Sequence, residues 1–450
     1  MPSTRRRFLT GTAAVAALLA GCNETDSSGS TGTVTPVDVP RTDRQILREA
    51  SEISYPDVSK SVIVSDTHQR AAIRHVESVI ERLETVLAEN DVDFSGFERR
   101  GASRDPTDNT EDVRTRIKDA NERIETARED DPSSESLRSL ERALRTTSVL
   151  LGFVLAETGQ TELADVEATL EAERAAVADI KDGLEYRIAQ PVEEHLPTLY
   201  AAETKLSRSD QLQFVADTVD DADPKNDQYA TEIGQVRRSI ELHRRRRDDA
   251  KRFIDTATDA DAPPLRDAID RNVVALRESL EPIASEYRDW DGGSENDSIA
   301  SDLRRSRASV GRRTSRWLSN MERHRTDGSR VLGLRDGLEQ RIEFAAIDAA
   351  VSRSLARLDG REFLAEAVIN EKQRAVAAVE GVAGGSAFLR DVGRRSTSVL
   401  DIADRNRRPD GVAVDVVART YFLYAVAAEW ATRADEQCSD LLASLQAKQS

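Results

Sequence analysis

The chain has 450 residues and a formal net charge of −18, with 82 acidic against 64 basic side chains. This balance argues against nucleic acid as the main partner, because phosphate backbones attract basic surfaces. Only two cysteines occur, Cys22 and Cys438, which excludes a fold held together by several disulfides.

The N-terminal 22 residues have the layout of an export signal. A short basic stretch precedes an apolar run that ends at about Ala20. As a helix this run is about 20 Å long, shorter than the roughly 30 Å hydrocarbon core, so it predicts a signal and not a membrane span. The informative residues are Arg5 and Arg6, Phe8 and Leu9 after them, and Leu19, Ala20, Gly21 and Cys22.

These residues resemble the signals of twin-arginine lipoproteins, particularly those of salt-loving archaea. In that resemblance Arg5 and Arg6 are the twin pair, and Leu19 to Cys22 form the lipobox. It implies cleavage after residue 21, a lipid on Cys22, and a location on the outer face of the cytoplasmic membrane. An acidic composition with 56 arginines and only 8 lysines is likewise similar to that of proteins adapted to high salt.

Residues 22–41 predict a flexible tether. Residues 23–40 are rich in Ser, Thr, Gly and Pro and hold too few apolar residues to order themselves. Beyond the tether we expect one helical bundle over residues 42–223. Residues 224–450 would form a second bundle or a continuation of the first.

Apolar residues recur at helical spacing through nearly all of this body. Ile73, Val76, Ile80, Leu83 and Leu87, for example, are separated alternately by three and four positions. The fold class is therefore all-α, with long antiparallel helices in one or two bundles. A helical solenoid is less favoured, since no fixed repeat occurs. The expected helices cover residues 42–53, 66–90, 110–130, 133–158, 161–190, 192–220, 225–260, 264–288, 297–324, 328–383 with a break near Gly360, and 386–447 with a break near Pro409.

Prolines and caps mark several boundaries. Asp131 and Pro132 predict a capping carboxylate followed by a proline at the first helical position. Pro191, Pro197 and Pro282 fall within helical patterns, where each should kink or split a helix.

No motif for a metal, a cofactor or catalysis appears. His68 and His75 share a helix face but lie about 10 Å apart along its axis, too far for one metal ion. The glycines of residues 380–390 lack the lysine and the preceding strand of a phosphate-binding loop. We therefore expect no metal site, no cofactor and no enzymatic activity.

Two basic stretches stand out, residues 237–252 and 302–335. One interpretation is that these helices pair with acidic neighbours, such as those of residues 161–185, inside a bundle. The other is an exposed face for an anionic partner: an acidic envelope protein, a glycan or a lipid headgroup. The residues of that face would be Arg244, Arg245, Arg246, Arg247, Arg312, Arg313 and Arg316.

The sequence favours a lipid-anchored helical-bundle protein that acts through protein or cell-envelope contacts, without catalysis. The alternative is a ligand- or solute-binding lipoprotein that serves a transporter, which a pocket between helices would support. Carboxylates and a histidine converging from distant helices would instead favour an enzyme.

Overall fold

A computed structural model describes residues 41–58, 62–92, 94, 106–209, 229–290, 298–359, 365–405 and 414–447. These residues are mainly helical, and the only extended pairing among them is one antiparallel bridge between Ile188 and Thr258. The all-α prediction is confirmed. None of the described helices is long and apolar enough to cross a membrane. The signal, the lipobox and most of the tether lie outside the described residues.

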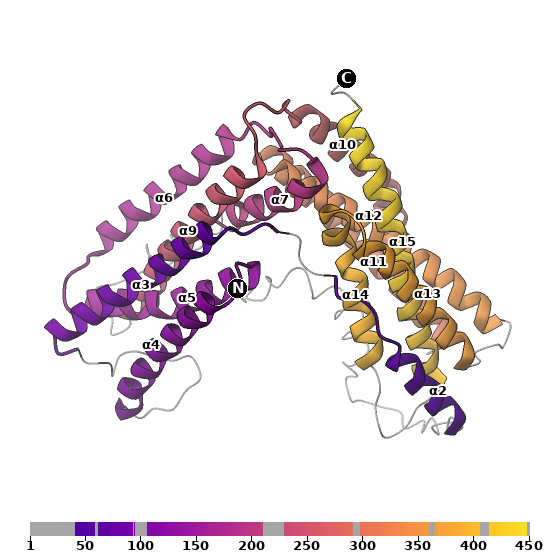
Figure 1. Cartoon of the computed structure of the whole chain (residues 1–450), viewed down its shortest axis with the longest axis horizontal. Helices are drawn as coiled ribbons and strands as arrows, with labels where there is room; N and C mark the ends of the chain where they lie inside the picture. The colour runs from indigo at the N-terminus through magenta and orange to yellow at the C-terminus, as the bar shows by residue number, and fades with distance from the viewer. Residues whose placement is uncertain are drawn as a thin grey trace. The chain divides into compact units, whose positions relative to one another are not determined.

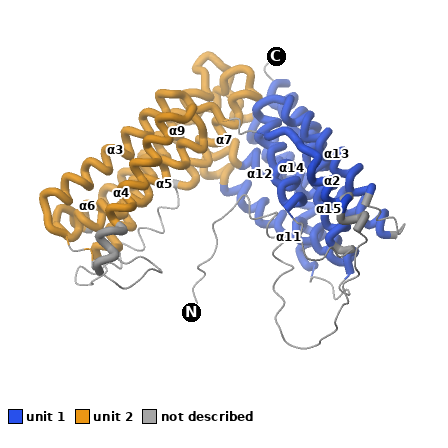
Figure 2. The backbone as a smooth tube through the Cα atoms, turned by 60° about the horizontal axis from the view of Figure 1, so that its bottom comes forward, with its two compact units in different colours: residues 1–60, 268–323, 333–450 blue, residues 61–267, 324–332 orange. Residues whose placement is uncertain are grey.

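The chain divides into two compact units, coloured separately in Figure 2. Unit 1 consists of residues 1–60, 268–323 and 333–450, and unit 2 of residues 61–267 and 324–332. The expected division at residue 223 lies outside the described residues. The described residues on both sides of that position belong to unit 2, because the next described helix, Tyr229–Ala257, packs on the helices Ser134–Glu157 and Val192–Ser209.

Unit 2 is built around two long helices, α5 (Ser134–Glu157) and α9 (Tyr229–Ala257), which pack against each other (Figure 1). Residues 147–155 of α5 are buried on every side, because α3, α4 and α9 all contact this helix. The other helices in the described part of unit 2 are α3 (Asp66–Glu89), α4 (Pro106–Glu129), α6 (Leu163–Gly183) and α7 (Val192–Ser209).

Two glycines allow α5 and α9 to approach closely. A Cβ atom on Gly152 would lie 2.8 Å from Cα of Gly234, and one on Gly234 would lie 2.7 Å from the carbonyl oxygen of Val149. Beside this crossing, α6 adds Val166 and Leu170 to a cluster on the apolar stripe of α9. The crossing thus sets the spacing between the two helices that carry most of the charged side chains described below.

Unit 1 has its own core around α15 (Val414–Gln446), which packs on α13 (Ala365–Ala383) and α14 (Ala387–Arg405). The aromatic segment at Tyr421–Tyr424 and Trp430 is buried, as a core helix requires, and Trp430 donates to the carbonyl of Val392 at 3.2 Å. The other described helices that lie wholly or mostly in unit 1 are α2 (Arg41–Glu52), which packs on α13, and α10 (Arg266–Glu286), α11 (Ile299–Thr326) and α12 (Arg330–Asp359).

Most of the expected helices are present within a few residues of their expected limits. The expectation for residues 161–190 was wrong at its end, because α6 stops at Gly183 and residues 186–189 bond to the last residue of α9 and the segment after it. The interruption before α7 occurs at Pro191, whereas Pro197 and Pro282 lie inside the unsplit helices α7 and α10.

Candidate anion-binding site

Helix α9 carries four consecutive arginines, Arg244 to Arg247, near the middle of its length. Successive residues are turned by about 100° around a helix axis, so four in a row point to all sides. The four guanidinium groups therefore meet different neighbours, and each must be considered separately.

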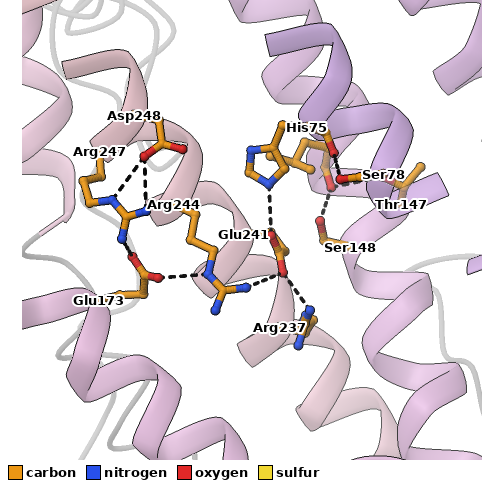
Figure 3. A network of polar contacts seen from close by, with 11 residues as sticks. His75, Ser78, Thr147, Ser148, Glu173, Arg237, Glu241, Arg244, Arg247 and Asp248 are labelled. Atoms are coloured by element: carbon orange, nitrogen blue, oxygen red, sulfur yellow. Dashed lines mark hydrogen bonds and ion pairs between the residues drawn. The ribbon is translucent and has the colours of Figure 1, made fainter. Parts of the chain in front are cut away.

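Arg244 and Arg247 reach α6. Nε of Arg244 lies 2.9 Å from Oε1 of Glu173, and Nη1 of Arg247 pairs with Oε2 of the same carboxylate (Figure 3). Arg244 also binds Oε1 of Glu241 at 3.1 Å, and Nε2 of His75 on α3 lies 3.0 Å from Oε2 of Glu241. One network thus ties α9 to both α6 and α3.

Arg245 and Arg246 each form an ion pair with a carboxylate inside unit 2. Arg245 is 1% exposed, and its Nη2 lies 2.5 Å from Oδ1 of Asp249. Nη2 of Arg246 lies 2.7 Å from Oε1 of Glu141 on α5. Nζ of Lys205 on α7 bridges the two carboxylates, at 3.1 Å from Oε2 of Glu141 and 3.1 Å from Oδ2 of Asp249.

The prediction of an exposed face at Arg244, Arg245, Arg246 and Arg247 is therefore wrong. The competing interpretation, pairing with the acidic helix of residues 161–185, holds for Arg244 and Arg247 through Glu173. The physical reason is burial, because a guanidinium group removed from water needs a carboxylate partner.

The three arginines predicted on α11 differ from one another. Arg313 is half-buried and binds Oε1 of Glu343 at 3.1 Å. Arg312 is exposed, with its guanidinium carbon 5.0 Å from the ring centroid of Trp290, and Arg316 is exposed. Of the predicted face, only Arg312 and Arg316 lie at the surface.

A cavity of about 320 Å³ lies between α5, α7 and α9, and six of its twelve lining residues are basic. This volume is at the lower end of the range for small-ligand pockets. Helix α5 contributes one face, since its lining residues recur at intervals of three and four. We call this cavity the arginine pocket. Its charged lining residues are Arg138, Glu141, Arg142 and Arg145 on α5, Lys205 and Arg208 on α7, and Arg246 on α9.

Glu141 is the carboxylate among these lining residues and is firmly ionised. Burial would raise its pKa, but Lys205 and Arg246 outweigh burial and lower the pKa to about 2.

On the neighbouring surface of α9, burial and the charge of Arg145 lower the pKa of Arg238. Arg238 forms no ion pair within the described part of the chain, so positive charge is in excess around the pocket.

The histidines on α3 face α9. Nε2 of His68 lies 2.8 Å from Oδ1 of Asp249, and both side chains are almost completely buried. Burial lowers the pKa of His68 despite this bond, so His68 is neutral near pH 7. Within the described ranges, no group of three or more His, Cys, Asp or Glu side chains could hold a metal ion.

Residues 67–267 match the profile of a protein family described as a domain of unknown function (DUF8262). The matched domain includes all six basic residues of the arginine pocket. No curated protein and no solved structure is significantly similar to the chain. The profile therefore identifies residues 67–267 as a recurring domain but assigns no activity to it.

Of the six basic residues that line the pocket, only Arg246 is among the predicted site residues, and the other five are not. A signal was present, since Arg138, Arg142 and Arg145 have helical spacing and share one face of α5. It was overlooked because these residues are spread along the chain, whereas Arg244 to Arg247 are consecutive.

Proposed function

We propose that this protein is an exported, lipid-anchored binding protein in which the matched domain, residues 67–267, holds a small anionic ligand in the arginine pocket. The observation that carries the proposal is the lining of the pocket, where six basic side chains surround one carboxylate. This excess is notable in a chain whose net charge is −18. A concentration of positive charge in a concave site favours an anion there.

The proposal corresponds to a ligand-binding lipoprotein and not to a protein that acts through its outer surface alone. Arg244 to Arg247 are engaged inside unit 2 and are not free for a partner. A contact with an acidic envelope protein, a glycan or a lipid headgroup is a second candidate, supported by the exposure of Arg312 and Arg316 on α11.

A binding role is supported over a catalytic one by the state of the charged groups at the pocket. General acid–base catalysis needs a group whose pKa lies near the working pH. Glu141, with a pKa of about 2, is held as a carboxylate by Lys205 and Arg246. His68 and Asp249 bind each other behind the pocket and are closed off from solvent.

Export and anchoring rest on the twin arginines, Arg5 and Arg6, and on Cys22 at the end of the lipobox. A lipid on Cys22 would hold the chain at the outer face of the cytoplasmic membrane. The flexible tether predicted for residues 23–40 would have a root-mean-square reach of about 25 Å between Cys22 and α2. A ligand-binding domain in a chain anchored in this way is suited to capturing a solute before it reaches a transporter.

The experiment is a thermal-unfolding titration with a panel of anions at constant ionic strength. A ligand that binds only the folded chain raises the melting temperature with its concentration. We expect at least one anion to do so for the parent chain, and the double variant Arg142→Gln/Arg145→Gln to lose the response. The proposal is wrong if no anion in the panel stabilises the parent, or if the double variant responds equally.

A further inference from the structure

The basic residues of the arginine pocket fall into two groups. Lys205 and Arg246 are neutralised by Glu141 and Asp249, and Nη1 of Arg138 binds Oε2 of Glu135 at 2.9 Å. The second group consists of Arg142, Arg145 and Arg208. These three are exposed at the pocket and form no ion pair within the described part of the chain.

The placement of these three residues suits an anion with more than one charge. Arg142 and Arg145 are three residues apart on α5, about 4.5 Å along the helix axis, and Arg208 lines the same cavity from α7. A carboxylate has two coplanar oxygens, which one guanidinium fork can satisfy. A phosphate monoester has three terminal oxygens and a charge of nearly −2, so it can accept bonds from two or three forks.

The rest of the pocket suits an organic group. Leu137, Phe253 and Val62 contribute apolar atoms to its lining. The ring of Phe253 is held in place by an edge contact with His68, with ring centroids 4.7 Å apart. An inorganic phosphate ion would leave this apolar part of the lining without a contact.

Resting on the function proposed above, we infer that the ligand of the arginine pocket is a phosphate monoester. Arg142, Arg145 and Arg208 bind its phosphate group, and its organic part lies against Leu137 and Phe253. A soluble metabolite and a lipid headgroup can both present this chemistry, and the matched domain can meet either one at a membrane surface.

The decisive measurement is calorimetry on the full-length chain in mild detergent, with phenyl phosphate, benzoate and inorganic phosphate at constant ionic strength. Phenyl phosphate and benzoate carry the same ring and differ in the anionic group. We expect phenyl phosphate to bind at least tenfold more tightly than either of the others. Arg142→Gln and Arg145→Gln should each weaken its binding about tenfold or more, the effect of losing a charge-assisted hydrogen bond. Neither variant should change the melting temperature.

The matched control is Arg82→Gln on α3, an exposed arginine that does not line the pocket, and it should bind phenyl phosphate as the parent does. A second arm uses phosphatidylcholine vesicles with and without phosphatidic acid, whose headgroup is a phosphate monoester. Binding to phosphatidic acid that Arg142→Gln abolishes identifies a lipid as the source, and binding of phenyl phosphate alone identifies a soluble ester.

Two outcomes separate this inference from the proposed function. If benzoate binds as tightly as phenyl phosphate and Arg142→Gln weakens both, the pocket binds anions generally, and the phosphate assignment is overturned while the proposed function stands. If no anion binds, or if Arg82→Gln weakens binding as much as Arg142→Gln, the inference and the pocket both fail.

Discussion

Single residues in unit 2 combine charge and burial in ways that make them sensitive to substitution. Asp249 is hydrogen-bonded to His68 and forms ion pairs with Arg245 and Lys205, and these three partners lie on three different helices. Burial would raise its pKa, but Arg245 and then Lys205 lower it well below the usual value. Asp249 is therefore ionised at any ordinary pH and holds three partners together in the interior.

The first prediction is that Asp249→Asn destabilises the protein by about 3–5 kcal/mol, because it leaves the buried guanidinium of Arg245 without a counter-charge. The measurement is the free energy of unfolding from urea titration. The matched control is Asp255→Asn, an exposed position on the same helix, where a change within about 0.5 kcal/mol is expected. Equal effects of the two substitutions would contradict the role of Asp249.

A second buried carboxyl group, that of Glu203 on α7, has a raised pKa, whereas the pKa of Asp249 is lowered. Its Oε1 lies 2.6 Å from the hydroxyl oxygen of Tyr186, and its Oε2 accepts from the backbone of Leu332 at 2.5 Å. Tyr186 also contacts the carbonyl of Gly328, so one phenolic proton has two acceptors. If Glu203 is protonated, both contacts are hydrogen bonds, because Glu203 then donates to the hydroxyl oxygen of Tyr186 and Tyr186 donates to the carbonyl of Gly328.

Burial raises the pKa of Glu203 to about 7, more than its hydrogen bonds from Tyr186 and Leu332 lower it. Because this pKa is higher than the usual 4.5, folding takes up a proton. Glu203 thus favours folding most below about pH 4.5, and that contribution is lost as the pH rises through 7.

The second prediction follows from the raised pKa of Glu203. Glu203→Gln should have little effect near pH 5 and should stabilise the protein at pH 8 by on the order of 2 kcal/mol, since its amide is never charged. Unfolding titrations at the two pH values give the difference. Glu84→Gln, at an exposed position on α3, should change neither value. A variant of Glu203 that is no more stable than the parent at pH 8 would contradict the assignment.

At the scale of helices, local patterns predicted most of the fold, and non-local contacts account for the errors. The spacing of apolar residues located the helices, because that spacing depends only on neighbours in the chain. The cap of α5 was assigned to Asp131, whereas Ser133 caps the helix and accepts from the backbone of Ser136 at 3.1 Å. Both residue types cap helices equally well, so the sequence could not choose between them.

The end of α6 and the partners of the basic helix α9 could not be read locally. Residues 184–190 leave the helical path because they bond to a segment some seventy residues later, for example from Ala189 to the carbonyl of Ala257 at 2.9 Å. Likewise the carboxylates that hold Arg244 to Arg247 come partly from α5 and α6. Which helix faces which is a property of the packed unit, and no spacing in the sequence states it.

The third prediction concerns the crossing of α5 and α9. Gly234→Ala should destabilise the protein by about 1–3 kcal/mol, because the added methyl group would overlap the backbone at Val149. Thermal unfolding measures the loss. Gly381→Ala in α13 is the matched control, since a Cβ there meets nothing within 4 Å and alanine favours a helix by up to about 1 kcal/mol. If Gly234→Ala is as well tolerated as Gly381→Ala, the crossing does not depend on the glycine.

At the scale of the whole molecule, the predicted signal and lipid anchor would determine where the proposed binding domain works. Their evidence is confined to the first 22 residues, which lie outside the described structure.

The fourth prediction is that Cys22→Ala leaves the chain exported but either uncleaved at the lipobox or released from the membrane. Replacing Arg5 and Arg6 with Lys should retain the precursor inside the cell. Fractionation and immunoblotting report both results, and a Cys22→Ala chain that matures and stays with membranes like the parent would contradict the anchor.

The packing of α2 on α13 has a consequence for how the protein is made. These helices belong to one unit, but 331 residues are synthesised between Glu52, where α2 ends, and Ala383, where α13 ends. At 5–20 residues per second, translation of that stretch takes roughly 20 to 70 s. During that time α2 has no completed α13 to pack on, while residues 61–267 of unit 2 are synthesised. The side of α2 that packs on α13 therefore stays uncovered until most of the chain has been synthesised, and this contact of unit 1 cannot form before all of unit 2 has been made.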